Sequence, residues 1–451
     1  MSVFKYFFSL KKILILQIVF LAGCSVHSIH DSSYISDSIH SRTGHALNLT
    51  KEKEVFELPD GVSLDDGLTG EEAVAIALWN NAQFQADIME IGFARADLIE
   101  AGLLRNPVFS LLFPLGPKQL EATLNLPLEF FWQRPKRVAA AKLNVERVAD
   151  NLVQHGLNLT RDVMIAYAEL ILTRERSRIV AEEAILRSEI AAIASARLKV
   201  GDISELEETA FRLEAARTQE ASIRFARDVK LAEERLKTLL GLGMTEVTLE
   251  LSLIPVSFEQ GLDSSKLLNT AFAARPDLRA AELEIEAAGH RLGWERSKIF
   301  NLTGMLDANG EGKEGFEMGP GMQLELPVLN WNNGKILRAQ TELEQAARQY
   351  VAVRHRIARE VMEAYTNYLA AQQALKILRV DILPSAQTAT ENAQGAYSIG
   401  EISYLEFLDF KRSLLDSLLR EAEAVAELRR AEAFLKHSIG FTPMKTVNDG
   451  I

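Results

Sequence analysis

The sequence predicts a mostly α-helical chain with a small amphipathic β-sheet, built as a tandem internal repeat. Long stretches rich in Ala, Glu, Leu and Arg contain almost no proline, a composition typical of long helices. Shorter stretches alternate between apolar and polar residues, as strands with one buried face do. The turn sequence Gly-acid-Ile-Ser occurs twice, at 201–204 and at 400–403, which indicates two copies of one unit.

The first 23 residues are predicted to be a bacterial lipoprotein signal peptide. Three lysines precede the apolar segment 13–21, which is too short to span a bilayer as a helix. The Leu-Ala-Gly-Cys sequence at 21–24 resembles a lipoprotein cleavage site, which implies acylation of Cys24. In such lipoproteins a Ser at position 25 implies sorting to the outer membrane. The alternative is an ordinary signal peptide with a chance cysteine.

Residues 24–68 are predicted to form a lipid-anchored, polar and solvated N-terminal segment. Four of the eight histidines lie in it, namely His27, His30, His40 and His45. A metal-collecting tail is the alternative, although these spacings define no coordination geometry. The formal net charge of −12 and the lack of a basic tract argue against a nucleic-acid partner. A single cysteine excludes a disulfide framework.

An offset of 199 residues aligns much of the second half of the chain with the first. It places Gly201 on Gly400 and Trp132 on Trp331. We therefore predict two repeats, separated by a linker and followed by a short tail. Their bounds are 70–242 for repeat 1, 243–264 for the linker, 265–441 for repeat 2 and 442–451 for the tail.

Each repeat is predicted to contain three helical stretches. These are 71–104, 137–200 and 203–240 in repeat 1, and 265–298, 335–399 and 402–439 in repeat 2. The middle stretch of repeat 1 contains no proline and would extend roughly 95 Å as one continuous helix. Its counterpart in repeat 2 contains only Pro384, which should kink the helix or mark a junction.

Two pairs of strands are predicted between the first and the middle helical stretches. In 119–130 the even positions are all apolar and the odd positions mostly polar, and 106–113 is the expected partner strand. The segments 299–309 and 322–328 repeat this alternation. Four strands cannot close on themselves in a membrane, because hydrocarbon offers no partner to an open edge and membrane barrels start at eight strands. A trimer would supply twelve strands for a β-barrel, beside a barrel of long α-helices.

The order of these elements resembles the TolC family of outer-membrane efflux proteins over nearly all of residues 70–441. Residues 327–340 are similar to the family's Pro-hydrophobe-Gly-basic entry into the long helix, and Tyr-Ser-Ile-Gly at 397–400 is similar to its hairpin tip. Residues 129–142 look like the heavy-metal branch, of the CzcC/CusC type. The resemblance implies a passive trimeric duct in the outer membrane that extends into the periplasm. Its implied partners are a second and third copy, a periplasmic adaptor, an inner-membrane pump of the RND type, and outer-membrane lipid.

The resemblance also implies roles for residues near the two glycine turns. The exposed hairpin tips would contact the adaptor through Val200, Gly201, Asp202, Ile399, Gly400 and Glu401. Acidic rings inside the periplasmic entrance would be formed by Glu406 and Asp409, and an entrance latch by Tyr397 and Glu207. The sequence departs from the family pattern at Ile402, where a basic residue can stand.

No motif for catalysis, for a cofactor or for a metal site is found, so the chain is predicted not to be an enzyme and to bind no cofactor. Transport energy would then come from a partner. The alternative function is a lipid-anchored periplasmic coiled-coil scaffold without a pore. The exported substrate stays open among metals, drugs and secreted proteins, because the long helices carry no ladder of Met or His.

Overall fold

The computed structural model describes residues 26–48, 56–64, 67–113, 120–243, 247–252, 261–312 and 315–440. These residues form two compact units. Unit 1 comprises residues 1–35, 87–153 and 276–355, and unit 2 comprises 36–86, 154–275 and 356–451. The predicted signal peptide, the lipidation residue Cys24 and the tail 442–451 lie outside the described residues.

Unit 1 contains a four-stranded antiparallel sheet in the order β1-β2-β3-β4. The strands are β1 (Val108–Leu112), β2 (Glu121–Pro127), β3 (Leu302–Gly312) and β4 (Gly315–Leu324). The register pairs Leu124 with Phe109 on one side and with Leu306 on the other. Three of the predicted strands are therefore confirmed, whereas β4 coincides with the predicted 322–328 only at 322–324 and begins seven residues earlier. The central pairing of β2 with β3 joins residues far apart in the sequence.

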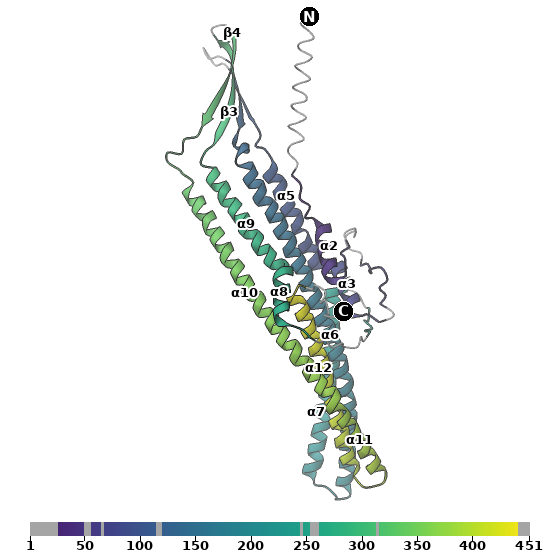
Figure 1. Ribbon diagram of the computed structural model, residues 1–451. Coiled ribbons are helices and arrows are strands. Elements are labelled where there is room, and N and C mark those ends of the chain that lie inside the picture. The colour runs from purple at the N-terminus through teal and green to yellow at the C-terminus, as the bar shows by residue number, and fades with distance from the viewer. Residues whose placement is uncertain are drawn as a thin grey trace. The chain divides into compact units, whose positions relative to one another are not determined.

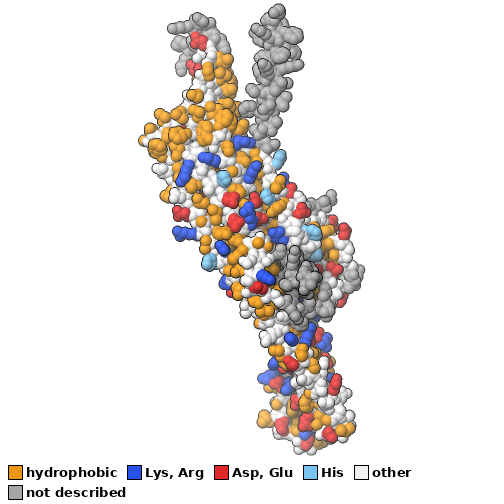
Figure 2. All heavy atoms as spheres, viewed as in Figure 1, with side chains coloured by type: hydrophobic (Ala, Val, Ile, Leu, Met, Phe, Trp, Pro, Cys, Tyr) orange, Lys and Arg blue, Asp and Glu red, His pale blue; other side chains and the backbone are white. Residues whose placement is uncertain are grey.

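The register places apolar and polar residues on opposite faces of the sheet, because directly paired residues lie on the same face. The apolar face carries Phe109, Leu111, Ala122, Leu124, Leu126, Leu302, Leu306, Ala308, Met318, Met322 and Leu324. The other face is mostly polar and carries Ser110, Glu121, Thr123, Asn125, Thr303, Asp307, Asn309, Glu317 and Gln323, together with the apolar Val108, Leu112 and Met305. Figure 2 shows hydrophobic side chains gathered on the visible side of this sheet and of the neighbouring helix ends in unit 1.

Two strands end earlier than the alternation predicts. Strand β2 ends at Pro127, and Glu129–Phe131 form a short 3₁₀ turn, η1. Strand β4 ends at Leu324, ahead of Pro327. Proline has no amide hydrogen for a ladder bond, so β2 ends at one, while the edge strand β4 accommodates Pro320 within its length.

The helices of unit 1 are α5 (Glu90–Gly102), α9 (Pro276–Ser297), the first part of α6 (Arg134–Lys199) and the first part of α10 (Asn333–Ile377). Figure 1 shows them side by side, with the sheet at one end. Arg134 and Arg137 donate through Nε to the carbonyls of Gly102 and Ala101, at 2.7 and 2.8 Å. These cations complement the unsatisfied carbonyls at the C-terminal end of α5.

Unit 2 contains the remaining helices. They are α2 (Ser32–Thr43, mostly in this unit), α3 (Gly70–Asn80), α4 (Ala82–Ile88), α7 (Glu205–Leu240), α8 (Ser264–Ala274), η2 (Leu378–Ile382), α11 (Leu383–Ser398) and α12 (Tyr404–Ser438), with the later parts of α6 and α10. None of the described helices is long and apolar enough to cross a membrane.

The two first helical stretches are not continuous, contrary to the sequence prediction. The stretch 71–104 is divided at Asn81 and again near Met89, and the stretch 265–298 is divided at Arg275. The Asn81 side chain accepts from the backbone N–H of Phe84 at 2.9 Å and so begins a new helix. Pro276 follows Arg275 and occupies the first position of α9, where its missing N–H costs little.

The middle helical stretches follow the prediction closely. Helix α6 runs for 66 residues without interruption. In repeat 2, α10, η2 and α11 together also span 66 residues, but η2 is a π-helical segment. Its bond from the Leu383 N–H to the Leu378 carbonyl skips one residue more than an α-helix does. The π-segment ends two residues before Pro384, whose ring would clash with the Val380 carbonyl in a regular α-helix.

Residues 32–43 are not part of a solvated linker, which corrects the prediction for this part of the N-terminal segment. Residues 32–43 form α2, and the side chains of Ile35 and Ile39 are fully buried. Within unit 2, Ile39 lies so close to Gly156 that a Cβ on this glycine would approach its Cδ1 to 2.5 Å. Helix α2 therefore packs on α6 through Ile39, and Ile35, four residues earlier, lies on the same face of this short helix.

One set of contacts in unit 2 recurs in both repeats, at an offset of 194 residues for the donor side chains and 199 residues for the acceptor carbonyls. The Asn81 amide donates to the Leu239 carbonyl at 3.0 Å, and the Arg275 guanidinium to the Ser438 carbonyl at 3.4 Å. Each carbonyl lies two residues before a left-handed glycine, Gly241 or Gly440. In each repeat, the residue at the break in the first helical stretch thus donates a hydrogen bond to a carbonyl near the C-terminal end of the last helix of that repeat, α7 or α12. This recurrence supports the proposed duplication.

Candidate functional site at the hairpin tips

The first hairpin tip joins α6 to α7 through a left-handed glycine. Gly201 has φ +76° and donates to the Leu198 carbonyl at 2.9 Å, while the Asp202 N–H reaches back to the Arg197 carbonyl at 3.0 Å. This pattern is a Schellman motif, in which glycine avoids the steric cost that a Cβ would add. Arg197 and Asp202 also form an ion pair, with 2.6 Å between Nε and Oδ2.

The second hairpin tip, between α11 and α12, has the same backbone. Gly400 has φ +79° and donates to the Tyr397 carbonyl at 3.0 Å, and the Glu401 N–H bonds to the Ala396 carbonyl at 2.9 Å. A Cβ at Gly201 or Gly400 would meet no atom within 4 Å. The positive φ is therefore the only local reason for glycine at either tip.

The helices that follow the two tips, α7 and α12, both begin with a capping box that the sequence analysis did not identify. The Ser204 hydroxyl accepts from the Glu207 N–H at 3.2 Å, and the Glu207 carboxylate accepts from the Ser204 N–H at 2.8 Å. Ser403 and Glu406 repeat the arrangement at 3.3 and 2.7 Å. These backbone and hydroxyl bonds lower the pKa of Glu207 and Glu406 below the ordinary glutamate value. The signal was the Ser-x-x-Glu spacing in both turns.

All six residues predicted to contact an adaptor are exposed. They are Val200, Gly201, Asp202, Ile399, Gly400 and Glu401. Val200 is 80% and Ile399 71% exposed, so each tip presents one large apolar side chain to solvent. Figure 1 shows the two turns at the same end of unit 2. An apolar residue followed by Gly and an acid is thus displayed twice on one surface.

The two acids predicted to form rings are exposed near the start of α12. Glu406 is the third residue of the helix and takes part in the capping box. Asp409 lies three residues later, with 3.6 Å between its Oδ1 and Nη1 of Arg412. Both carboxylates therefore lie on one helix face close to the tip, and each already has a partner within the chain.

The predicted latch residues do not contact each other within the chain. Tyr397 packs against Tyr404, with ring centroids 5.1 Å apart, and stacks on Phe407 at 5.9 Å with an interplanar angle of 11°. Glu207 caps α7 instead. A latch between Tyr397 and Glu207 stays a prediction for the assembled protein.

A different tyrosine joins the two hairpins. Tyr404, the first residue of α12, donates through its hydroxyl to Oε2 of Glu189 on α6 at 3.3 Å. Burial and the nearby Glu189 carboxylate raise the pKa of the Tyr404 phenol. The ring packs on a core in which Ile190 of α6 and Leu408 of α12 are buried. No local sequence pattern could reveal this contact, because its two residues are 215 positions apart.

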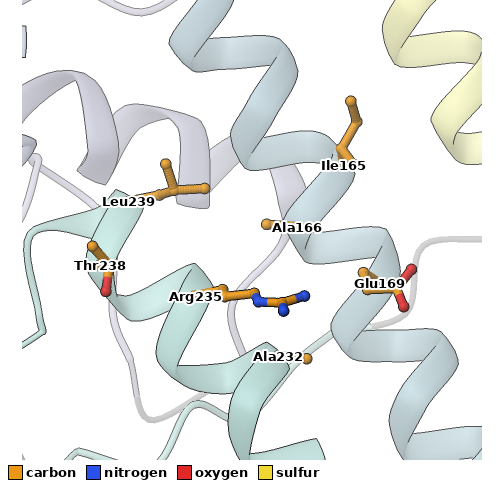
Figure 3. Close-up of a pocket in the computed structure, with 7 residues that line it drawn as sticks. All are labelled: Ile165, Ala166, Glu169, Ala232, Arg235, Thr238 and Leu239. Atoms are coloured by element: carbon orange, nitrogen blue, oxygen red, sulfur yellow. The ribbon is translucent and has the colours of Figure 1, made fainter. Parts of the chain in front are cut away.

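A groove of about 570 Å³ lies between α6 and α7 in unit 2 (Figure 3). Most of its lining is apolar, with Arg235 and Glu169 as the charged members. Glu169 is already paired with Arg430 at 2.9 Å. Among the described residues, no group of three or more His, Cys, Asp or Glu side chains could hold a metal ion.

Comparison with known families decides the identity of this fold. The family model described as outer membrane efflux protein matches residues 116–242 and 267–441. The chain belongs to the outer membrane efflux protein family. It is the outer-membrane channel component of an efflux system, of the TolC type that the sequence predicted.

Two sequence relatives carry names that mention metal resistance or cation efflux. The cobalt-zinc-cadmium resistance protein CzcC of Cupriavidus metallidurans is 23% identical over 381 residues, covering 83% of this chain and 90% of the relative. The cation efflux system protein CusC of Escherichia coli K12 is 30% identical over 201 residues, covering 41% of this chain and 42% of the relative.

Solved structures share the fold of this efflux protein. The crystal structure of CusC has a TM-score of 0.66 at 19% identity, covering 86% of this chain and 96% of that chain. The outer-membrane channel OprN has a TM-score of 0.68 at 21% identity, with coverages of 90% and 96%. The mostly helical chain with one small antiparallel sheet therefore has the fold of outer-membrane efflux channels. Its family places the protein in the outer membrane.

Proposed function

We propose that three copies of this chain form a passive duct, with a 12-stranded β-barrel in the outer membrane and a barrel of long α-helices in the periplasm. Each copy contributes the four strands of unit 1. Acylation of Cys24 would anchor each copy to the inner leaflet of the outer membrane. The duct would receive substrate from a periplasmic adaptor and an inner-membrane pump of the RND type, which supplies the energy.

The single observation that supports the pore best is the sheet of unit 1. Its order leaves β1 and β4 as edges among the described strands, and one face exposes large apolar side chains such as Phe109, Met318 and Met322. Lipid would cover that face favourably, but it would leave both edges without hydrogen-bond partners. Pairing β4 of one copy with β1 of the next would give both edges hydrogen-bond partners over the length they share, and would turn the face that carries Glu121 and Asp307 toward the lumen.

The tips support the proposed contact with an adaptor. Three copies would bring six Gly turns together, each with one exposed Val or Ile and one acid. The same assembly would place three copies of Glu406 and of Asp409 near the axis, as acidic rings that attract cations. The latch formed by Tyr397 and Glu207 would act between the hairpins at the same level.

We further propose heavy-metal cations as the cargo, because CzcC and CusC are named for cobalt, zinc and cadmium resistance and for cation efflux. The described residues contain no metal-binding cluster, so selection among cargos would lie in the pump. The duct itself would supply only a negatively charged path, which favours cations without binding them tightly.

The pore is tested with full-length protein purified in mild detergent. We expect a trimer on native mass spectrometry and ion conductance after insertion into planar bilayers. A monomer that conducts nothing would contradict the proposal and favour the periplasmic scaffold. The cargo is tested by deleting the gene in its host and comparing growth on cobalt, zinc or cadmium salts with growth on a hydrophobic antibiotic. Sensitivity to the antibiotic alone would refute a metal cargo.

A further inference from the structure

We infer that Pro320 fixes the register in which β4 of one copy pairs with β1 of the next. The partner at both open edges of the sheet is a second copy of this chain, so the inference rests on the proposed trimer. It adds the alignment of the two strands and the point at which their pairing ends.

Pro320 lies on β4 at a position whose backbone groups face the open edge of the sheet. The Glu325 N–H donates to the Asn301 carbonyl at 3.1 Å, and these two residues continue the register of β4 with β3. Hydrogen-bonded and non-hydrogen-bonded pairs alternate along an antiparallel ladder, so Leu306 and Pro320 form a non-hydrogen-bonded pair. The nitrogen of Pro320 therefore points away from β3. Because proline has no N–H, the open edge lacks one donor there.

Strand β1 points the backbone groups of Phe109 and Leu111 at the other open edge. The Leu128 N–H donates to the Leu302 carbonyl at 2.8 Å, so the even-numbered residues of β2 are those bonded to β3. The odd-numbered residues of β2 are then bonded to β1, and they lie opposite the even-numbered residues of that strand. The N–H and C=O groups of Phe109 and Leu111 therefore face outward, away from β2.

The two edges have complementary side chains as well as complementary backbone groups. Their outward-facing residues lie on the apolar face of the sheet; they are Phe109 and Leu111 on β1, and on β4 they include Met318, Pro320, Met322 and Leu324. A shift of the pairing by one residue would lose both the hydrogen bonds and the match of faces, so only shifts by two are possible. Four registers place both outward residues of β1 opposite β4, with Phe109 facing Leu324, Met322, Pro320 or Met318.

Pro320 excludes two of these four registers. With Phe109 opposite Met322, Pro320 faces Leu111, and in the next register it faces Phe109 itself. In either case one carbonyl of β1 receives no N–H from β4. Such a carbonyl is costly in a membrane, because hydrocarbon offers no other donor. The two remaining registers place Phe109 opposite Leu324 or opposite Met318.

The tilt of the strands in a closed barrel distinguishes the two remaining registers. Within one copy, the paired residues lead from Val108 on β1 to Gly321 on β4. With Phe109 opposite Leu324, Gly321 faces Leu112 of the next copy, four residues beyond Val108. Three copies then give a stagger of 12 residues over 12 strands. At about 3.4 Å per residue and about 4.8 Å between strands, the tilt is about 35°, as in membrane barrels.

The other register gives a tilt of the wrong hand. With Phe109 opposite Met318, Gly321 faces Asn106 of the next copy, so the stagger reverses its direction. The fixed twist of β-sheets does not allow this sense of tilt when the apolar face is outside. We therefore expect Phe109 opposite Leu324. Pro320 then lies opposite the residue directly after β1, where pairing between the copies ends.

Disulfide formation between copies tests this register. Ser110 and Gln323 would face each other as a non-hydrogen-bonded pair, with Cα atoms about 4.5 Å apart, which a disulfide can bridge. On mild oxidation in outer-membrane vesicles, S110C/Q323C should give a covalently linked trimer. S110C/G321C and S110C/G319C, which trap the two registers excluded by Pro320, should give about tenfold less, for one lost hydrogen bond. S110C alone controls for reaction through Cys24. Strongest linkage in S110C/G321C, S110C/G319C, S110C/E317C or S110C/E325C would overturn the inference.

Pro320→Ala tests the role of the proline itself, because it restores the missing N–H. The yield of S110C/Q323C relative to S110C/G321C should fall about tenfold in this background. Pro327→Ala is the matched control, since Pro327 follows the end of β4, and it should leave the relative yield unchanged. An equal yield ratio in Pro320→Ala and in the control would show that the proline does not fix the register.

Native mass spectrometry and bilayer conductance of the wild type separate the two proposals. If the wild type is a conducting trimer and another cysteine pair links best, the inference fails alone and the pore stands. If the wild type is a monomer that conducts nothing and no pair links, the proposed function fails and the inference fails with it. A conducting trimer linked through S110C/Q323C, with the ratio lowered by Pro320→Ala, supports both.

Discussion

Replacing Gly241 with Ala should destabilise the protein more than the same change at any of the other three hairpin or helix-end glycines in the repeats. Gly241 ends α7 at φ +77°, and a Cβ there would lie 2.3 Å from the Asn80 carbonyl oxygen. The atom that the Cβ would meet belongs to the backbone, so rotation of a side chain cannot relieve the clash. The end of α7 would have to move away from the break between α3 and α4.

The magnitude follows from two contributions. A left-handed conformation costs an alanine about 1–2 kcal/mol, and forced displacement of packed backbone adds about 1–3 kcal/mol. Gly241→Ala should therefore lower the free energy of unfolding by about 3 kcal/mol. Gly201→Ala and Gly400→Ala carry only the first contribution, because nothing lies within 4 Å of their Cβ positions. Gly440→Ala should fall between them, with its nearest contact at 3.3 Å.

The assay is chemical unfolding of the detergent-solubilised protein, followed by the loss of helical circular dichroism. All four variants share the same gain from a stiffer unfolded chain, so their differences report native-state strain. If Gly241→Ala unfolded within about 0.5 kcal/mol of Gly201→Ala, the close approach of α7 to Asn80 would be wrong.

Three further predictions concern charge and anchoring. Arg275→Met should cost about 2–3 kcal/mol, because the Arg275 side chain is 3% exposed and its loss removes the 2.6 Å partner of Glu360, which then keeps only Arg356 at 3.6 Å. A cost below about 1 kcal/mol in the same unfolding assay would contradict this. The pKa of Glu406 is lowered in the folded protein. Its cap therefore stabilises the tip at any pH above the ordinary glutamate pKa of 4.5, and this stabilisation is lost as the pH falls through the lowered pKa of the folded state. Hydrogen exchange of the tip amides should accordingly differ between wild type and Glu406→Gln at pH 7 and converge under acid, and a difference that persists unchanged would refute the capping role. Cys24→Ala should abolish incorporation of labelled palmitate, whereas equal labelling of the variant would exclude acylation at this residue.

The regular elements could be predicted because their signals are local and repeated. Alternation over 119–130 predicts β2 since one face of the sheet is apolar and the other polar. The long helices were predicted from the lack of proline, and Pro384 correctly marked the junction that the structure resolves as a π-segment. Pairing of β2 with β3 could not be read from either strand alone.

The missed features depend on single side chains and on distant partners. The break at Asn81 was missed because an asparagine between helical residues gives a weak signal, and its amide bonds to a carbonyl 158 residues away. Helix α2 was missed because Ile35 and Ile39 are its only buried hydrophobic residues, in a segment rich in serine. At the tips, the glycines were found from their repetition, whereas the bond between Tyr404 and Glu189 requires the three-dimensional arrangement.

The duplicated helix break offers an internal comparison between two chemical solutions. In one half the neutral amide of Asn81 donates a hydrogen bond to the end of α7. In the other half the buried guanidinium of Arg275 donates to the end of α12, and Glu360 balances its charge. Each half is thus a naturally occurring variant of the other at corresponding positions. Exchanging the two side chains between the halves and measuring the free energy of unfolding would show how strongly the neighbouring residues in each half now favour their own side chain. No second protein is needed for this comparison.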